Sequence, residues 1–523
     1  MEQSEKKLTK RAGRTAFGTL LSRILGYARD MLVARLFGVE MFADAFYAAF
    51  RVPNLFRRLF GEGSFSAAFI PVFSKSLHTK SKKETQKLLS SVFTTLVSVL
   101  VIVTILGILF SPLLVKLIAW GFDSEKMALT IEITRWMFPF IVFICLAAFL
   151  LAILNTLKTF FLPAFAPSAL SMSEIFYVLA IAPLIIASPD KIVGLAISVV
   201  VGGALHFAIQ YPKLKSLGWH LKFQPLIAAF KHPGVKRIGI LMIPSVIGLS
   251  VDQINSFVDS ICASFLETGS MSALYYSNRV MQLPLAIFGL AFASVSLPAM
   301  SKAYAKNDMK TLKSSLNHSV RFSIFMLVPA AVGLIVIGLP IVSLLFERGL
   351  FDSRASQITN YALMFYSIGL PAYACARIFA NAFFSFQDTK TPVWTALWAM
   401  LLHVVLCVAV MLWTNMGVGG LALATALASY FNVALLAMLL RKKIGKIGLK
   451  KIVYSTLKSV AAALAAGLAA FFSINVSQSV FIAVPVAIMA GAVAFFVFAK
   501  IFNAEEMSVL KNILSRKKGV LSE

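Results

Sequence analysis

Charged residues are scarce in this chain, and acidic residues are fewer than basic ones. Asp and Glu number 22 among 523 residues, and all charged residues make up 14% of the sequence. Hydrophobic residues make up 59%, and the mean hydropathy is +0.84. This balance excludes a water-soluble globular protein and indicates a chain that crosses a membrane many times.

Long apolar segments recur along the chain. A membrane-spanning helix needs about 20 mostly apolar residues, and we expect an all-α polytopic membrane protein with 14 transmembrane helices. The predicted spans are 15–37, 42–74, 88–118, 132–157, 163–187, 190–212, 236–262, 272–298, 316–346, 357–386, 391–414, 418–440, 452–472 and 479–501. The basic start runs into a full-length span without a small-residue cleavage site, so we expect no cleaved signal.

The basic residues behind the net charge of +27 are distributed unequally between the two sets of alternate loops. With the N-terminus assigned to the cytoplasm, alternate loops and the C-terminal tail hold 33 Lys and Arg residues. The opposite loops hold four, which are Lys126, Lys191, Arg348 and Arg354. This positive-inside pattern predicts that both termini are cytoplasmic. We therefore expect the basic loops to interact with the anionic headgroups of the lipid bilayer, and we do not expect them to bind nucleic acid.

Cysteine and histidine are also rare. Cys145, Cys262, Cys375 and Cys407 are isolated and lie within or near apolar spans, which is typical of small buried side chains. His206 and His403 lie in spans without a second candidate ligand nearby in the sequence. We therefore expect neither redox chemistry nor a metal site.

An internal repeat organises the chain. Residues 44–75 and 272–302 share Arg-Val, a following Pro, Phe-Gly, then Pro and Ser-Lys, and Arg51 and Arg279 are 228 residues apart. Six spans separate equivalent points, so the halves share one orientation, as in the parallel repeats of transporters. We expect two six-helix lobes in a parallel pseudo-repeat plus two C-terminal helices. The predicted parts are 1–227, 228–445 and 446–523.

Charges in the first two spans lie at membrane depth, where charge is expensive and usually marks function. Arg23 and Asp30 share one helix face, since they are seven residues apart. The full set is Arg23, Arg29, Asp30, Arg35, Asp44, Arg51, Arg57, Arg58 and Glu62. Six arginines thus meet three acids, and Arg279 adds a cation from the second half.

The arginine excess predicts a cavity for an anion. A planar guanidinium donates two parallel charge-assisted hydrogen bonds to phosphate and stays protonated when partly desolvated. We expect the cavity to prefer a phosphorylated headgroup. The alternative, ion pairs between helices and snorkelling near helix ends, fits Arg14, Arg35 and Arg58 better. The expected functional arginines are Arg23, Arg29, Arg57 and Arg279.

Short motifs occur in both halves of the chain. They are Ser22-Arg-Ile-Leu-Gly-Tyr-Ala-Arg-Asp30, Asp44-Ala-Phe-Tyr47, Pro53-Asn-Leu-Phe-Arg-Arg58, Gly61-Glu-Gly-Ser64, Tyr276-Ser-Asn-Arg279, Phe346-Glu-Arg-Gly349 and Asp388-Thr-Lys-Thr-Pro392. These motifs closely resemble those of the MurJ/MviN family of lipid II flippases. The resemblance covers essentially the whole chain, and 14 spans is the family's count within the multidrug/oligosaccharidyl-lipid/polysaccharide exporter group.

The resemblance implies a transporter rather than an enzyme. Its substrate would be the undecaprenyl-diphosphate-linked peptidoglycan precursor, moved between leaflets of the bacterial inner membrane by alternating access, without a cofactor and as a monomer. The family's essential arginines fall on Arg23, Arg29, Arg57 and Arg279. Supporting polar residues of the cavity would be Ser22, Asp30, Asp44, Asn54 and Glu62. Spans 13 and 14 would form a groove for the polyprenyl tail.

The energy source is left open. Asp252 and Asp259 are seven residues apart in span 7, with Asn255 on roughly the same side, so they either hold a coupling cation such as sodium or pair within the bundle. Span 11 has no carboxylate to complete a cation site, and membrane potential is the alternative.

Other functions remain as alternatives. A flippase for another polyprenyl-diphosphate-linked saccharide shares the same charge logic. A MATE-like multidrug exporter of cations would line its cavity with acids instead of arginines. A membrane-embedded enzyme is disfavoured, because the chain has no HExxH motif, no clustered carboxylates with metal spacing and no nucleophile with a nearby base.

Overall fold

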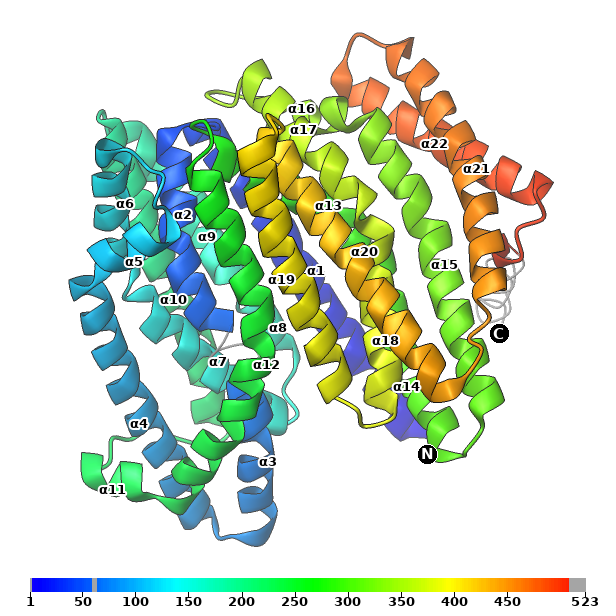
Figure 1. Ribbon diagram of the computed structural model, residues 1–523. Coiled ribbons are helices and arrows are strands. Elements are labelled where there is room, and N and C mark those ends of the chain that lie inside the picture. The colour runs from blue at the N-terminus through cyan, green and yellow to red at the C-terminus, as the bar shows by residue number, and fades with distance from the viewer. Residues whose placement is uncertain (1, 59–63, 508–523) are drawn as a thin grey trace. The chain divides into compact units, whose positions relative to one another are not determined.

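The computed structural model describes residues 2–58 and 64–507, and these residues form helices joined by short loops (Figure 1). The expected all-helical architecture is confirmed. Contacts divide the chain into two compact units, Met1–Met271 and Ser272–Glu523.

The first unit is built from helices that differ widely in length. They are α1 (Glu2–Phe37), α2 (Met41–Phe56), α3 (Ser64–Thr79), α4 (Lys82–Leu109), α5 (Ser111–Ile118), α6 (Ser124–Met137), α7 (Phe140–Thr156), α8 (Phe161–Phe165), α9 (Ser168–Phe176), the π-helical η2 (Tyr177–Ile181), the 3-10 turn η3 (Ala182–Leu184), α10 (Ser188–Ser216), α11 (Leu226–Lys231) and α12 (Pro233–Ser264).

The second unit continues the same kind of architecture. Its elements are α13 (Ser270–Pro284), which begins just before the unit boundary, the π-helical η4 (Leu285–Gly289), α14 (Leu290–Ala305), α15 (Met309–Val336), α16 (Gly338–Phe346), α17 (Ser353–Ile368), α18 (Leu370–Ser385), α19 (Lys390–Trp413), α20 (Gly417–Ile444), α21 (Leu449–Ser473), the 3-10 turn η5 (Ile474–Val476) and α22 (Val480–Ile501).

Most of the predicted spans meet the length and composition of a membrane-crossing helix. Within the described residues, nine helices do so, and counting each of two bent helix pairs as one span gives eleven. The pairs are α6 with α7, bent by 40°, and α17 with α18, bent by 42°. The other three predicted spans fall on α1, on α2 with α3, and on α12, so the count of 14 stays a prediction.

The internal repeat recurs in the helices. Helices α4 and α15 are both 28 residues long, begin 227 residues apart and are each followed by a short helix, α5 or α16. Pro112 and Pro340 lie in the first turns of these short helices, where a residue without an N–H is tolerated. A π-helical turn begins at Arg57 in the first unit and at Leu285 in the second, which matches the 228-residue offset. The predicted two-fold repeat is thereby confirmed.

The contact boundary and the repeat boundary differ. By the repeat, α12 corresponds to α1, because their ends are about 228 residues apart. By contacts, α12 packs against α3, α4 and α5, and so belongs to the first unit. The division into lobes at residues 227 and 228 follows the repeat and stays a prediction.

The C-terminal pair α21 and α22 packs within the second unit against α15 and α16. Helix α21 lies against both α15 and α22 (Figure 1). Beyond α22, Arg321 of α15 pairs with Glu505 at 2.8 Å and with Glu506 at 2.6 Å. The hydroxyl of Ser455 in α21 donates to the same Glu506 carboxylate at 2.7 Å. This network ties the end of α22 to α15 and α21.

All four cysteines are buried, as expected of small side chains within apolar spans.

Candidate functional site

Helix α1 carries the first predicted arginines. Ser22 is half-buried and Arg23 is exposed, whereas the Arg29 side chain is 14% exposed and Asp30 is buried. The Arg29 guanidinium donates to Oδ1 of Asp30 from Nε at 3.0 Å and from Nη2 at 2.7 Å. Its Nη1 donates to Oε1 of Glu174 in α9 at 3.2 Å. Two buried carboxylates therefore share this one guanidinium.

The end of α2 carries Arg57 in a π-helical turn. Its Nε donates to Oδ1 of Asn54 at 2.9 Å. Pro53 lies one turn before this break and cannot donate a backbone hydrogen bond. Arg57 acts electrostatically on Cys145 of α7 and His206 of α10. Single π-helical turns of this kind occur often at functional sites.

Buried polar atoms accompany Arg57. His206 is 6% exposed, and neither ring nitrogen has a hydrogen-bond partner among the described residues. The Gln210 side chain in the next turn is fully buried and donates from Nε2 to the carbonyls of Ala147 and His206. The predicted Glu62 lies outside the described residues.

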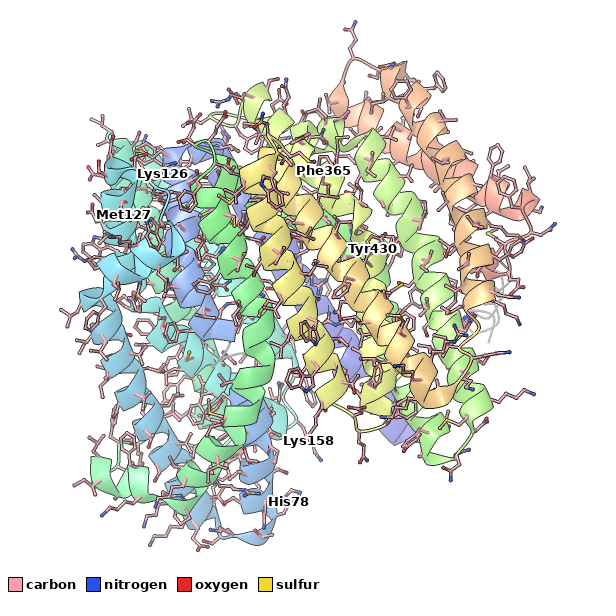
Figure 2. The ribbon with its side chains drawn as sticks, in the orientation of Figure 1. His78, Lys126, Met127, Lys158, Phe365 and Tyr430 are labelled. Atoms are coloured by element: carbon pink, nitrogen blue, oxygen red, sulfur yellow. The ribbon has the colours of Figure 1, made fainter. Side chains whose placement is uncertain are left out.

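Asp44 of α2 belongs to a different cluster. Lys126 of α6, labelled in Figure 2, has its Nζ 3.6 Å from Oδ2 of Asp44. It also donates to Oγ1 of Thr268 at 2.9 Å, and Asp44 accepts a hydrogen bond of 2.7 Å from the Gly269 N–H. Asp44 is 1% and Lys126 is 4% exposed. Lys126 was expected to be a loop cation, but it lies in the first turn of α6 and is buried beside Asp44 and Thr268.

The second unit holds the fourth predicted arginine. Arg279 is half-buried in α13, less than two turns before the π-helical η4. Tyr276 in the preceding turn is fully buried and packs against the rings of Phe346 and Phe351. This aromatic cluster fixes the part of α13 that carries Arg279.

The predicted coupling residues lie in α12. Asp259 is half-buried, and the side chain of Asp252 lies outside the described residues. In the second unit, His403 of α19 lies 3.3 Å from Sγ of Cys407 and 3.3 Å from Oγ1 of Thr425 in α20. Cys407 follows His403 by one helical turn, so His403 does have a second candidate ligand nearby in the sequence, contrary to expectation.

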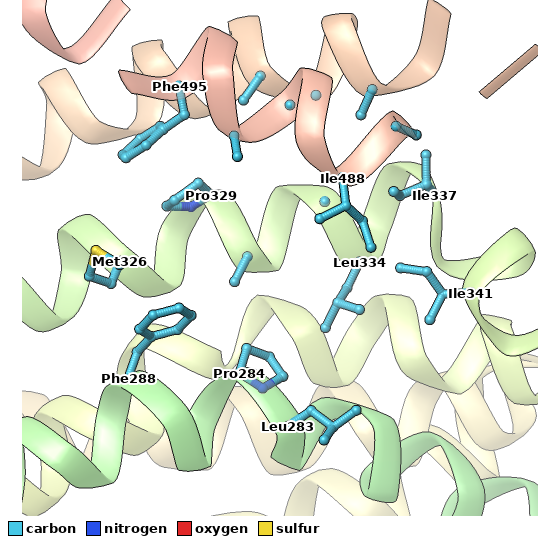
Figure 3. A pocket seen from close by; sticks show the side chains of 18 of the residues that line it. Leu283, Pro284, Phe288, Met326, Pro329, Leu334, Ile337, Ile341, Ile488 and Phe495 are labelled. Atoms are coloured by element: carbon cyan, nitrogen blue, oxygen red, sulfur yellow. The ribbon is translucent and has the colours of Figure 1, made fainter. Parts of the chain in front are cut away.

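An apolar cavity of about 460 Å³ opens within the second unit. It lies between α13, η4, α15, α21 and α22, and only apolar residue types and glycine line it. Figure 3 shows Leu283, Pro284 and Phe288 across the cavity from Ile488 and Phe495. Val280, the neighbour of Arg279 in α13, also lines it. Helix α13 thus contributes both a predicted headgroup arginine and a wall of the cavity.

The chain matches the family described as lipid II flippase MurJ over residues 33–490. It is 38% identical over 427 residues to a probable lipid II flippase MurJ of Vibrio cholerae, a match that covers 80% of each chain. It is 36% identical over 433 residues to a lipid II flippase MurJ of Burkholderia cenocepacia, covering 81% of this chain and 82% of that one. The chain belongs to the lipid II flippase MurJ family. It is therefore a multi-pass protein of the bacterial inner membrane, and its family is one of transporters.

Solved structures agree with membership of the MurJ family. A structure titled lipid II flippase MurJ, inward closed conformation, has a TM-score of 0.77 and 28% identity, covering 93% of this chain and 98% of that one. An inward-facing MATE family transporter of the MOP superfamily has a TM-score of 0.69 at 13% identity, covering 82% and 95%. At that identity the second likeness shows a common fold alone.

Sequence reasoning missed one residue of the candidate site, Glu174. This residue stands alone in the apolar stretch 168–184. A single acid inside a spanning segment is a signal that identifies it, because such acids are expensive and usually functional. Candidate acids for the arginine site were sought only in the first two spans, where the arginine excess lies, so Glu174 was not considered.

Proposed function

We propose that this protein is a lipid II flippase that moves the undecaprenyl-diphosphate-linked peptidoglycan precursor from the inner to the outer leaflet of the bacterial inner membrane. Membership of the MurJ family carries the proposal. The position of Arg29 in the first unit and of Arg279 beside an apolar cavity in the second supports it.

The proposed headgroup site uses Arg23, Arg29, Arg57 and Arg279. In the first unit, Asp30 holds one edge of the Arg29 guanidinium, so the fork is oriented before a ligand arrives. Preorganised guanidinium groups suit a diphosphate, because each offers paired, charge-assisted donors. Asn54 similarly orients Arg57.

The proposed tail site is the apolar cavity of the second unit. Its wall contains residues from α21 and α22, the predicted spans 13 and 14. A polyprenyl chain needs a surface without polar groups, which this lining provides. Because Arg279 directly precedes the wall residue Val280, a diphosphate bound at Arg279 would place the first isoprene units near the cavity.

The proposed mechanism is alternating access without covalent chemistry. The headgroup binds from the cytoplasmic side, the two repeats rock, and the headgroup is released outside while the tail stays in lipid. Both termini in the cytoplasm, a monomeric state and coupling through sodium or membrane potential are parts of this proposal. Asp252 and Asp259 are its candidate coupling residues.

The decisive test is lipid II exposure in cells depleted of their own flippase. The unmodified protein, Arg29→Ala, Arg279→Ala and the exposed control Arg441→Ala are produced at matched levels in the membrane. We expect the unmodified protein and Arg441→Ala to restore lipid II on the outer leaflet, and the other two to fail. If folded, unmodified protein restores no exposure, the proposed function is wrong.

Two rival functions predict other results in the same cells. A flippase for another polyprenyl-diphosphate-linked saccharide would leave lipid II inside and export that saccharide. A MATE-like exporter would protect cells from cationic drugs, and Arg29→Ala would leave this protection intact.

A further inference from the structure

Glu174 is a buried carboxylate at the centre of the first unit. It lies on α9 and is 3% exposed. The π-helical η2 begins three residues later, at Tyr177. Helix α9 packs against α1 and α10. Among the described residues, Glu174 pairs with Arg29 of α1, which also holds the neighbouring acid Asp30.

The bonds to Arg29 are unequal. Asp30 takes two donors of the guanidinium through one oxygen, at 2.7 and 3.0 Å, whereas Glu174 takes one donor at 3.2 Å. A longer charge-assisted hydrogen bond is a weaker one. The hydrogen bond from Nη1 of Arg29 to Glu174 is therefore the one that a competing anion breaks most readily.

We propose that Glu174 is a positioning residue that occupies Arg29 in the empty transporter and exchanges with the diphosphate of the substrate. This inference rests on the proposed function. Asp30 keeps the guanidinium oriented in both states, and Glu174 yields its place on Nη1 to a phosphate oxygen.

The exchange limits the affinity of the site. When the diphosphate takes Nη1, the buried Glu174 carboxylate loses a hydrogen bond from its cation, which is unfavourable at low dielectric. Substrate binding is weakened by that amount. A transporter needs this balance, because a diphosphate held by arginines without a competitor would leave the site slowly.

The test compares Glu174→Gln with the unmodified full-length protein. Binding of undecaprenyl diphosphate, with undecaprenol as the uncharged control probe, is measured by native mass spectrometry in detergent. Glu506→Gln is the matched control variant, because Glu506 is equally buried and also pairs with an arginine, Arg321, far along the chain. Flipping of lipid II is measured with the same proteins in liposomes.

We expect Glu174→Gln to bind undecaprenyl diphosphate about tenfold to a hundredfold more tightly, which corresponds to one charge-assisted hydrogen bond. Its flipping rate should fall, because release becomes slower. Glu506→Gln should bind with unchanged affinity, and no variant should change undecaprenol binding. Equal or weaker binding by Glu174→Gln would overturn the proposal, since a merely structural carboxylate gives that result.

Two further variants keep the outcomes distinct. If Glu174→Gln lowers the thermal unfolding midpoint, Glu174→Asp is used instead, because it retains the charge but withdraws it from Nη1, and tighter binding is again expected. Arg29→Ala tests the headgroup site itself. If Arg29→Ala binds undecaprenyl diphosphate as well as the unmodified protein does, the proposed headgroup site fails, and the role of Glu174 fails with it. If only Glu174→Gln departs from expectation, the flippase proposal stands.

Discussion

Replacing Lys126 by Met should strongly destabilise the first unit. The Lys126 ammonium lies 3.6 Å from the Asp44 carboxylate, donates to Thr268 at 2.9 Å and stands 4.7 Å from the centre of the Phe122 ring. Both charges are almost completely buried. The substitution keeps most of the side-chain volume and removes the charge, so the packing is disturbed little.

The expected loss follows from the distance and the burial. Two unit charges 3.6 Å apart attract by about 5 kcal/mol at an effective dielectric constant of about 20. Removing one member of a buried pair costs about 3 to 5 kcal/mol, because the remaining charge is left in a medium of low dielectric. Asp44 keeps its hydrogen bond from the Gly269 N–H. We therefore expect Lys126→Met to lower the free energy of unfolding by about 3 kcal/mol.

A double-mutant cycle measures this interaction. The free energy of unfolding is obtained from helicity during SDS titration of detergent-solubilised protein, for Lys126→Met, Asp44→Asn and the double variant. The double variant should be less destabilised than the sum of the two single variants, by about 2 kcal/mol. The exposed residue Lys116 of α5 provides a matched control, Lys116→Met, which should change stability little. Additivity within about 0.5 kcal/mol would refute the reasoning.

Three further substitutions test other parts of the structure. Gly269→Ala should destabilise the first unit by about 2 kcal/mol or more, because Gly269 has φ +97° and a Cβ there would lie 2.4 Å from the Val39 carbonyl oxygen; the same SDS titration measures it, and an unchanged midpoint contradicts it. Gly333→Leu should fill the apolar cavity and slow lipid II flipping about tenfold, equivalent to ~1.4 kcal/mol. The control Gly239→Leu also places its side chain where no atom lies within 4 Å, but outside the cavity, and should flip lipid II at the normal rate. Equal flipping rates for the two variants would argue against the tail site. Asp388→Asn should test pH dependence: burial opposes the shift, but hydrogen bonds from Lys443 and Thr391 outweigh it and hold the pKa of Asp388 below its ordinary value of 3.8. A depressed carboxylate pKa contributes stability that is complete above 3.8 and is lost as the pH falls through the lower folded-state value. The unmodified protein should therefore unfold at a higher midpoint than Asp388→Asn from pH 7 to about 5, and the two midpoints should converge as the pH falls from 3.8 through the lower folded-state pKa. A difference that does not shrink as the pH falls through this range would contradict the assignment.

Much of the fold is predictable from the sequence, because spans and breaks depend on local composition. The apolar run of α22 and the prolines in the first turns of α5 and α16 act within a single helix, so their effect does not require knowledge of distant partners. The 228-residue offset between Arg51 and Arg279 recurs in the structure, where π-helical turns begin at Arg57 and Leu285. The packing of α12 with α3 was not predictable in this way, because contacts between helices 170 residues apart leave no periodic signal.

The candidate site was predictable only in part. Arg29 and Arg57 were found from the sequence, because a charged residue within an apolar span is energetically unfavourable and therefore conspicuous. Their near neighbours Asp30 and Asn54 were found as well, whereas Glu174 was not, because it is 145 residues from Arg29 along the chain. Lys126 was counted with the loops, since its contacts with Asp44 and Thr268 join residues that are remote in sequence.

The sequence by itself determined that this chain is a helical membrane protein of two repeated halves, with excess arginine in the first two spans and the motifs of a lipid II flippase. These properties follow from composition, periodicity and residue identity, which are local quantities. Only the tertiary structure decided which acid meets which base. Asp44 is joined to Lys126 and Arg29 to Glu174, because the pairing of these charges depends on distances of a few ångströms between helices that are remote in sequence.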